Sequence, residues 1–312
     1  MSEIRWSAML GEWVIVTHKN ANRLLQESDL PCSICQSIEE IKEKWDVITQ
    51  DDPDALLQSS DGPFELDEEI VIGAPAYGFS KIIIQSPNHN EQIEDMDDVQ
   101  LTKVLAEYLS GFKELDTKKG IKYVLQFEQR TKSKGYKTDH THAKVYALPF
   151  VPLRVKREID QITKYQASFD TCMICETIEN EFKTRVRVIR ESDNFVSIIP
   201  YAARIPYEVH LYPKKHVASI LELKDDLSEM GMMIQDVVKR FSNIFDENEY
   251  VMVFHTRPSK DSHDYWHFHI EFYPSLRNIS GLQDLVEIET GAGILTNNSS
   301  PEENAKELRD TL

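Results

Sequence analysis

The sequence predicts an α+β fold made of two copies of one unit, each an antiparallel sheet with packed helices. Short runs rich in β-branched and aromatic residues alternate with longer segments whose apolar residues recur every three or four positions. A length of 312 residues is typical of two domains. Matched motifs also recur in the two halves of the chain, and we place the units at residues 1–153 and 154–312.

The repeat is clearest around two histidines. Tyr123-Val-Leu-Gln-Phe127 begins 17 residues before His140, and Tyr250-Val-Met-Val-Phe254 begins 17 residues before His267. Another histidine precedes each of these by 51 residues, and each half has its own Cys-x-x-Cys. Because chance supplies one such agreement more readily than all of them, we interpret the chain as an internal duplication.

Each copy has the same order of expected elements. An apolar strand, at 81–85 or 208–212, precedes an amphipathic helix, at 99–109 or 227–241. The Tyr-Val-x-x-Phe strand comes next, then a loop, then a strand with a His-x-His pair. The methionines of the second helix predict core packing rather than a cofactor site. The charged stretch 154–160 predicts a linking helix, and Ser-Pro-Glu-Glu at 300–303 predicts a capped terminal helix.

Composition restricts the classes of function. The chain has 53 acidic and 35 basic residues and a net charge of −18, which argues against binding to DNA, RNA or anionic lipid. No apolar run is long enough to span a membrane, and the first residues lack the pattern of a signal peptide. We therefore expect a soluble, cytoplasmic protein that does not associate with membranes.

The four cysteines form two Cys-x-x-Cys pairs, a spacing typical of metal ligands. With the matched histidines they predict two structural zinc sites, because Zn²⁺ takes cysteine and histidine in tetrahedral, four-coordinate sites. The first set is Cys32, Cys35, His89 and His140, and the second set is Cys172, Cys175, His216 and His267. The alternative is that these are reduced core cysteines, unrelated to the histidines.

His142 is the candidate catalytic residue. Alternation along a strand would place it on the same face as His140, beside a metal-anchored position but without a metal of its own. An imidazole that is largely neutral at physiological pH is a candidate nucleophile or general base. The alternative is a core histidine whose ring bonds to a backbone carbonyl.

A basic loop leads into this histidine. Its cations are Arg130, Lys132, Lys134, Lys137 and Lys144, and Asp139 alone opposes them. Gly135 permits a close approach of the backbone to a phosphate. Such a loop suits a phosphoryl or nucleotidyl substrate, although a run of charges also forms ordinary solvated surface.

The second copy does not repeat this chemistry. Glu271 stands where Lys144 stands in the first copy, and the loop at 257–264 is nearly neutral. We expect His255 and His269 to be polar pocket residues that rank below His142 as catalytic candidates.

At these residues the chain resembles the galactose-1-phosphate uridylyltransferases, a branch of the histidine-triad superfamily with duplicated domains. The matching segments extend over almost the whole chain, and their order and spacing are specific. They are Gly11-Glu-Trp-Val-Ile-Val16, the first Cys-x-x-Cys, Ser86-Pro-Asn-His89, Phe127-Glu-Gln through His140-x-His142, residues 206–209 and 213–217, Trp266 through Pro274, Glu289-Thr-Gly291 and Pro301-Glu-Glu.

The resemblance implies two histidine-triad-like domains and a nucleotidyltransferase that exchanges hexose 1-phosphates on a nucleoside diphosphate sugar, like a UDP-glucose:hexose-1-phosphate uridylyltransferase. His142 would attack the α-phosphorus of the nucleotide-sugar, release a sugar 1-phosphate and hold a nucleotidyl-histidine. The residues implied to contact substrate phosphate are Gln129, Arg130, Gly135, Lys137 and Lys144. The resemblance also implies a role in galactose and carbohydrate metabolism, and it is compatible with a homodimer.

Several positions depart from the family pattern. The usual His-Pro-His-x-Gln is His-Thr-His-Ala-Lys here, so Lys144 replaces the glutamine. Gln129 stands at the family's asparagine, and Lys137 stands at a serine that contacts phosphate. The segment that frames the base is not recognisable between Ala55 and Gly73. The base, uracil or adenine, and the identity of the hexose therefore stay open.

Two other functions stay open as well. A phosphorylase of the same fold, similar to the ADP-glucose or dinucleoside tetraphosphate phosphorylases, would use inorganic phosphate as the acceptor, and the additional lysines favour a small anion. The other is a zinc-stapled nucleotide-binding protein without turnover, which the altered glutamine position suggests.

Overall fold

The computed structural model describes residues 2–17, 32–39, 41, 43–59, 73–130, 140–245, 248–260, 263–275 and 288–312. The strands of the first half are β1 (Ser2–Ser7), β2 (Glu12–Thr17), β3 (Ile48–Asp51), β4 (Gly73–Pro75), β5 (Phe79–Ile84), β6 (Tyr123–Arg130) and β7 (His142–Leu148). Those of the second half are β8 (Val188–Glu191), β9 (Phe195–Ile198), β10 (Val209–Pro213), β11 (Tyr250–His255) and β12 (His269–Pro274).

The helices include the predicted ones. They are α1 (Ser33–Ile38), α2 (Asp98–Asp116), α3 (Leu153–Phe169), α4 (Met173–Thr184), α5 (Leu227–Ile244), α6 (Ile288–Ala292) and α7 (Pro301–Asp310), with 3₁₀ turns η2 (Ile93–Asp95) and η3 (Ile220–Leu223). The side chains of Asp97 and Ser300 accept backbone hydrogen bonds at the starts of α2 and α7. The predictions of an amphipathic helix in each half, a linking helix and a capped terminal helix are therefore confirmed.

The strands of the two halves join into one large sheet. Its order is β3-β5-β7-β6-β11-β12-β10-β9-β8, and a separate sheet has the order β2-β1-β4. Pairing is antiparallel throughout these two sheets. The halves meet where β6 pairs with β11, from Arg130 opposite Tyr250 to Gln126 opposite Phe254. The predicted α+β class with antiparallel sheets is confirmed, and the duplicated units share a continuous sheet.

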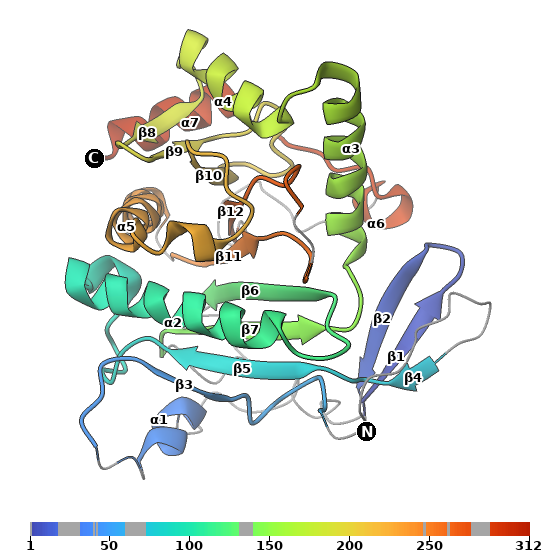
Figure 1. Cartoon of the computed structure of the whole chain (residues 1–312). Coiled ribbons are helices and arrows are strands. Elements are labelled where there is room, and N and C mark those ends of the chain that lie inside the picture. Colours follow the sequence, from blue (N-terminus) through green and yellow to red (C-terminus); the bar gives the residue numbers. More distant parts are fainter. Residues whose placement is uncertain are drawn as a thin grey trace.

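Helices α2 and α5 cover one face of this sheet (Figure 1). On β7, Ala143, Val145 and Ala147 point into the apolar core beneath these helices. Met230 and Met233 of α5 are buried in the same core, which confirms the predicted core packing of the methionine-rich helix. Since side chains alternate along a strand, His142, Lys144 and Tyr146 lie on the opposite face.

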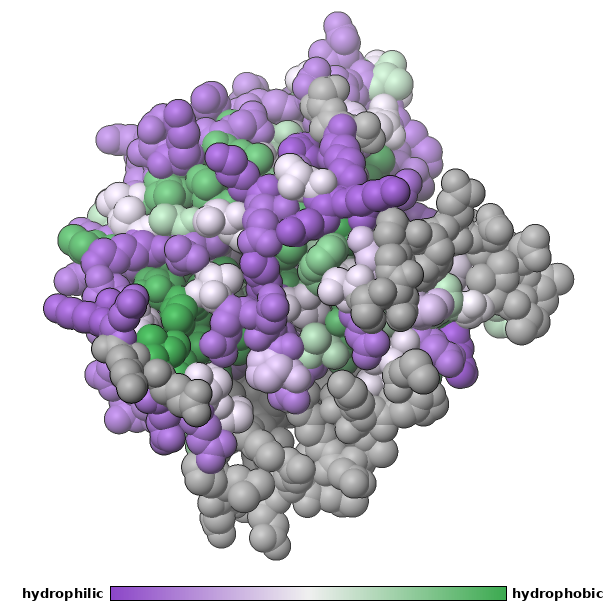
Figure 2. Space-filling model, turned by 60° about the horizontal axis from the view of Figure 1, so that its bottom comes forward, coloured by the Kyte–Doolittle hydropathy of each residue, from purple (hydrophilic) through white to green (hydrophobic). Residues whose placement is uncertain are grey.

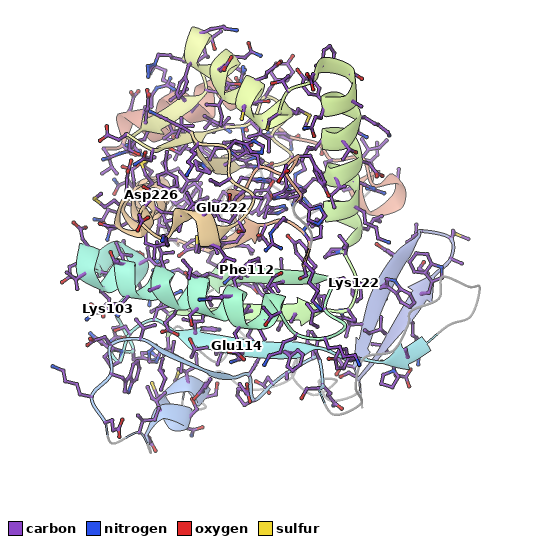
Figure 3. The ribbon with its side chains drawn as sticks, in the orientation of Figure 1. Lys103, Phe112, Glu114, Lys122, Glu222 and Asp226 are labelled. Carbon is purple, nitrogen blue, oxygen red and sulfur yellow. The ribbon has the colours of Figure 1, made fainter. Side chains whose placement is uncertain are left out.

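Ion pairs fasten α2 to the edge of the sheet. Figure 3 labels Lys103 and Glu114 on this helix. Lys103 Nζ lies 2.6 Å from a carboxylate oxygen of Asp46, which precedes β3, and Glu114 accepts from Lys81 of β5 at 2.5 Å. These pairs are exposed, and we assign them orientation rather than much stability.

The two copies of the Tyr-Val-x-x-Phe motif differ in register, contrary to the equivalence that the sequence repeat predicts. Tyr123 lies opposite Leu148, whereas Tyr250 lies opposite Pro274. The second tyrosine therefore pairs with a residue that is one position closer to it in the sequence. A shift of one residue turns every side chain to the other face of a strand. Tyr123 therefore packs in the cluster that includes Val155 of α3, and Tyr250 packs under α5.

Among the residues coloured by hydropathy in Figure 2, hydrophilic ones predominate and hydrophobic ones form patches between them. Within the described ranges, no helix is both long and apolar enough to cross a membrane.

Candidate active site and zinc sites

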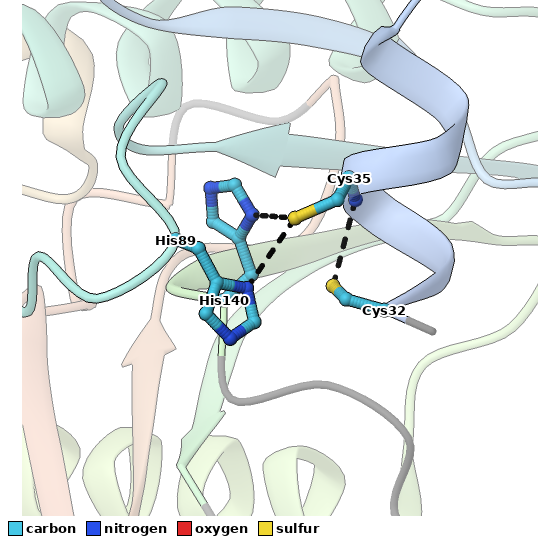
Figure 4. Close-up of side chains that lie close together, drawn as sticks. All are labelled: Cys32, Cys35, His89 and His140. Carbon is cyan, nitrogen blue, oxygen red and sulfur yellow. Dashed lines mark hydrogen bonds between the residues drawn. The ribbon is translucent and has the colours of Figure 1, made fainter. Parts of the chain in front are cut away.

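The first Cys-x-x-Cys starts a short helix beside two histidines (Figure 4). Cys32 is the N-cap of α1, and its sulfur accepts from the backbone N–H of Cys35 at 3.5 Å. Cys35 Sγ lies 3.3 Å from His89 Nδ1 and 3.5 Å from His140 Nδ1. The four ligand atoms all lie within 4.8 Å of one another. The chain thus brings together the whole first predicted ligand set.

The second set has the same construction. Cys172 is the N-cap of α4, and its sulfur accepts from the backbone N–H of Cys175 at 3.4 Å. Cys175 Sγ lies 3.4 Å from His267 Nδ1 and 3.6 Å from His216 Nδ1. These four ligand atoms also lie within 4.8 Å of one another. The duplication therefore extends to the geometry of the two clusters.

Both clusters have the dimensions of a tetrahedral zinc site. Zn–S and Zn–N bonds of about 2.3 and 2.05 Å at the tetrahedral angle separate sulfur from nitrogen by about 3.6 Å. The measured separations between sulfur and nitrogen run from 3.3 to 3.7 Å. Burial, and then the Cys172 thiol, raise the pKa of Cys175 to about 12, so a thiolate there requires a nearby cation.

Backbone carbonyls orient the ligand histidines. The Nε2–H of His140 donates to Ser86 O at 2.7 Å, that of His267 to Pro213 O at 2.9 Å, and that of His216 to Asp264 O at 2.8 Å. Each bond puts the ring proton on Nε2, so the lone pair of Nδ1 faces the cysteines. The donor set, its spacing and its hydrogen bonds all fit zinc.

Strand alternation does not determine how His142 lies relative to His140. Strand β7 begins at His142, so His140 and Thr141 precede the strand and the alternation argument does not apply to them. Instead, the Nδ1–H of His142 donates to the carbonyl of His140 at 2.8 Å. A carbonyl only accepts, so in the neutral ring the proton lies on Nδ1 and Nε2 has the lone pair. Burial lowers the pKa of His142, and the nearby Lys144 cation lowers it further.

The carbonyl bond matches the core-histidine alternative in part, because it satisfies one ring nitrogen. The residue His142 is nevertheless only partly buried. In the described ranges no hydrogen-bond partner of its Nε2 is found. The geometry therefore leaves one nitrogen of this imidazole for chemistry.

Lys144 and Gln129 share the face of His142. Lys144 Nζ lies 2.8 Å from Oδ2 of Asp52, a buried carboxylate that the sequence reasoning missed. The register that pairs Glu128 with Ala143 places Gln129 beside His142, with its side chain exposed. These two predicted phosphate contacts are near the candidate nucleophile.

Arg130 is placed elsewhere. It follows Glu128 by two positions on β6 and thus lies on the α5 side of the sheet. Its guanidinium bonds to Glu94 at 2.5 Å, which raises its pKa against the effect of burial. The structure does not bring it to His142. Gly135 and Lys137 lie outside the described residues, as do Lys132, Lys134 and Asp139.

In the second copy, His269 has the same local bond as His142. Its Nδ1–H donates to the carbonyl of His267 at 3.0 Å. Its Nε2, however, faces the Glu271 carboxylate at 3.6 Å, and the ring is buried and stacked on His255. A carboxylate at this position repels an anionic phosphate, so the expectation that His269 ranks below His142 has a physical basis.

A cluster of ion pairs surrounds Glu271. His255 donates to Glu271 at 2.8 Å and to Glu158 at 2.9 Å, and Arg154 of α3 also pairs with Glu271. On β10, His210 lies 2.9 Å from Glu208, which in turn pairs with Arg204. Helix α3 contributes two of these charges, and nothing in its sequence pattern beyond a charged stretch indicated this cluster.

Two family models match the chain in succession. Residues 1–152 match the model described as galactose-1-phosphate uridyl transferase, N-terminal domain, and residues 158–310 match the corresponding C-terminal domain. The chain is 31% identical to a galactose-1-phosphate uridylyltransferase of Thermotoga maritima, over 100% of this chain and 99% of that protein. It is 29% identical to an ADP-glucose phosphorylase of Arabidopsis thaliana, over 75% of this chain and 65% of that protein.

Two solved structures also resemble the structure of this chain. A uridylyltransferase structure superposes with a TM-score of 0.87 at 25% identity, over 99% of this chain and 98% of that one. An ADP-glucose phosphorylase from Arabidopsis thaliana with bound ADP-glucose superposes with a TM-score of 0.74 at 22% identity, over 100% of both chains. The second likeness shows the shared fold alone.

Proposed function

The chain belongs to the galactose-1-phosphate uridylyltransferase family, and we propose that it exchanges hexose 1-phosphates on a nucleoside diphosphate sugar through a nucleotidyl group held on His142. The observation that carries this proposal is the hydrogen bond from His142 Nδ1 to the carbonyl of His140, which presents Nε2 as a lone pair. The same proposal places the enzyme in galactose metabolism and in the cytoplasm.

In the first step the Nε2 lone pair attacks the α-phosphorus of the nucleotide-sugar. An N–P bond forms, the P–O bond to the sugar phosphate breaks, and the hexose 1-phosphate leaves with the electron pair. The imidazole ring gains positive charge, and the Nδ1–H bond to the His140 carbonyl stabilises that charge. In the second step an oxygen of another hexose 1-phosphate attacks phosphorus, and the electron pair of the N–P bond returns to Nε2.

Lys144 and Gln129 supply donors to the phosphate on this face of the sheet. Lys144 is anchored by Asp52, so its ammonium group is positioned before substrate binds. Its positive charge favours the anionic substrate. Burial lowers the pKa of His142, and the Lys144 cation adds to that effect, which favours the neutral imidazole.

Zinc in the two cysteine–histidine clusters would be structural. Cys32, Cys35, His89 and His140 would hold one ion, and Cys172, Cys175, His216 and His267 the other. A four-coordinate ion crosslinks loop to strand and leaves no position for substrate. The first cluster includes His140, whose carbonyl accepts from His142, so it fixes the backbone that orients the nucleophile.

A second candidate function is a nucleoside diphosphate sugar phosphorylase. The similarity to the Arabidopsis thaliana ADP-glucose phosphorylase and the cation at position 144 favour it. Inorganic phosphate would then discharge the nucleotidyl-histidine in place of a hexose 1-phosphate.

The test uses UDP-glucose and ADP-glucose radiolabelled in the nucleotide. We expect acid-labile, base-stable label on the protein, lost in His142→Ala and kept in His269→Ala. Discharge of the label by galactose 1-phosphate supports the transferase, and discharge by phosphate alone supports the phosphorylase. No label from any nucleotide-sugar would contradict both and favour a non-catalytic binding protein.

A further inference from the structure

A buried chain of polar side chains leads from the second half of the protein to the residue between His140 and His142. It consists of Tyr250 on β11, Glu128 on β6, Gln85 after β5, and Thr141. All four residues are buried, with 0% to 6% of their surface exposed. They lie on the α2 and α5 side of the sheet, behind the catalytic face, and no step of the proposed reaction uses them.

The contacts of this chain are continuous. Tyr250 Oη donates to Glu128 Oε1 at 2.7 Å, and Gln85 Nε2 donates to Glu128 Oε2 at 2.5 Å. Thr141 Oγ1 donates to Gln85 Oε1 at 2.8 Å. The backbone N–H of Gln85 also donates to Thr141 O at 3.3 Å, so Gln85 holds Thr141 at two points.

The direction of these bonds is set by Glu128. Both of its carboxylate oxygens accept, so the Gln85 amide turns its NH₂ group to Glu128 and its oxygen to Thr141. The hydroxyl of Thr141 must therefore donate. Because these groups are buried, each one left unpaired would carry a desolvation cost, which makes one arrangement of the chain preferred.

The same short segment also holds the ring of His140. Ser86 follows Gln85 and accepts from His140 Nε2 at 2.7 Å. Residues 85 and 86 thus fix both ends of the His140–Thr141 peptide, whose carbonyl belongs to His140 and accepts from His142. Thr141 supplies the side-chain hydroxyl that makes this connection.

We propose that Glu128 and Gln85 act through Thr141 as positioning residues for His142, and that Tyr250 ties this arrangement to the second half of the protein. The proposal rests on the proposed function of His142. The chain aims the His140 carbonyl at Nδ1 and thereby holds the ring in the tautomer and orientation that present Nε2 to phosphorus.

The experiment compares three substitutions. Thr141→Val removes the hydroxyl at nearly constant shape, and Thr141→Ser retains it. Thr49→Val is the matched control, because Thr49 is also a threonine whose hydroxyl donates to a side-chain oxygen, Glu107 Oε2 at 2.6 Å, away from His142. Single-turnover labelling with nucleotide-labelled UDP-glucose or ADP-glucose gives the rate of nucleotidyl-histidine formation. The ¹⁵N shifts of the His142 ring report its tautomer without any need for activity.

We expect Thr141→Val to form the adduct about tenfold more slowly with a KM within about twofold, since loss of alignment acts on the chemical step. Its ¹⁵N spectrum should show a mixture of tautomers, whereas Thr141→Ser and Thr49→Val should match the wild type in both measurements. The proposal is overturned if Thr141→Val keeps the wild-type rate and tautomer, or if Thr49→Val is equally slow. A wild-type protein without label would contradict the proposed function, while the ¹⁵N comparison would still decide on the hydrogen-bonded chain.

Discussion

Replacing His255 with glutamine should make the free energy of unfolding depend less on pH in the alkaline range. His255 is buried and donates from both ring nitrogens, to Glu271 at 2.8 Å and to Glu158 at 2.9 Å. Burial alone would lower the pKa of His255, but the two carboxylates outweigh burial and raise the pKa to about 9. The difference between the ordinary histidine pKa of 6.5 and a pKa of about 9 corresponds to roughly 3 kcal/mol.

The sign follows from the direction of the change. A histidine with a raised pKa contributes its stability fully below about pH 6.5 and loses it as the pH rises through about 9. His255 lowers the pKa of Glu158 to about 2 against the effect of burial, so this partner contributes above about pH 4.5 and loses its contribution as the pH falls toward 2. The ion pairs should therefore stabilise the fold between these limits.

The assay is urea unfolding of zinc-saturated protein at pH 6, 8 and 10, followed by the fluorescence of the buried Trp266. The difference in free energy of unfolding between wild type and His255→Gln should shrink by roughly 3 kcal/mol from pH 6 to pH 10. Glu158→Gln serves as the companion variant. Its difference from wild type in free energy of unfolding should shrink at acid pH, where Glu158 loses its contribution. A difference between wild type and His255→Gln that stays constant over this range would refute the ion-pair account.

Three further predictions concern the zinc content, the packing at Gly78, and the fall of the reaction rate at acid pH. We expect two zinc ions per chain by metal analysis; Cys175→Ser should retain one and still form the nucleotidyl adduct, and a wild-type count of one would show that the second ligand set is wrong. Gly78→Ala should destabilise the fold by about 2–3 kcal/mol in urea unfolding, because φ is +152° and the added Cβ would overlap the carbonyl oxygen of Ala147; unchanged stability would contradict that contact. Adduct formation needs neutral His142, whose pKa is lowered, so its rate should fall as the pH drops through a midpoint below 6.5, and Lys144→Met should move that midpoint upward; a downward movement would contradict the assigned effect of Lys144.

The sequence predicts best what local patterns and fixed spacings determine. The amphipathic helices, the capped terminal helix and the pairing of each Cys-x-x-Cys with two histidines all follow from the residues themselves. The first cysteine of each Cys-x-x-Cys pair is also the N-cap of a helix, so the same short motif determines both the start of the helix and the placement of the two sulfurs.

Tertiary contacts account for what the sequence did not predict. The one-residue difference in register between the two Tyr-Val-x-x-Phe strands arises from pairing with their neighbours and cannot be read from the spacing of 17 residues. The parity of β6 places Arg130 on the α5 side, where Glu94 binds it. Asp52 reaches Lys144 across 92 positions of sequence, and no local motif marks such a partner.

The most direct test of the account is to locate the covalent adduct. Wild-type protein is mixed with the nucleotide-sugar that labels it, quenched at alkaline pH, digested and analysed by mass spectrometry. We predict a nucleotidyl adduct on His142 that disappears when hexose 1-phosphate or phosphate is added. An adduct on another residue, or turnover without any adduct, would contradict the assignment of His142 as the nucleophile.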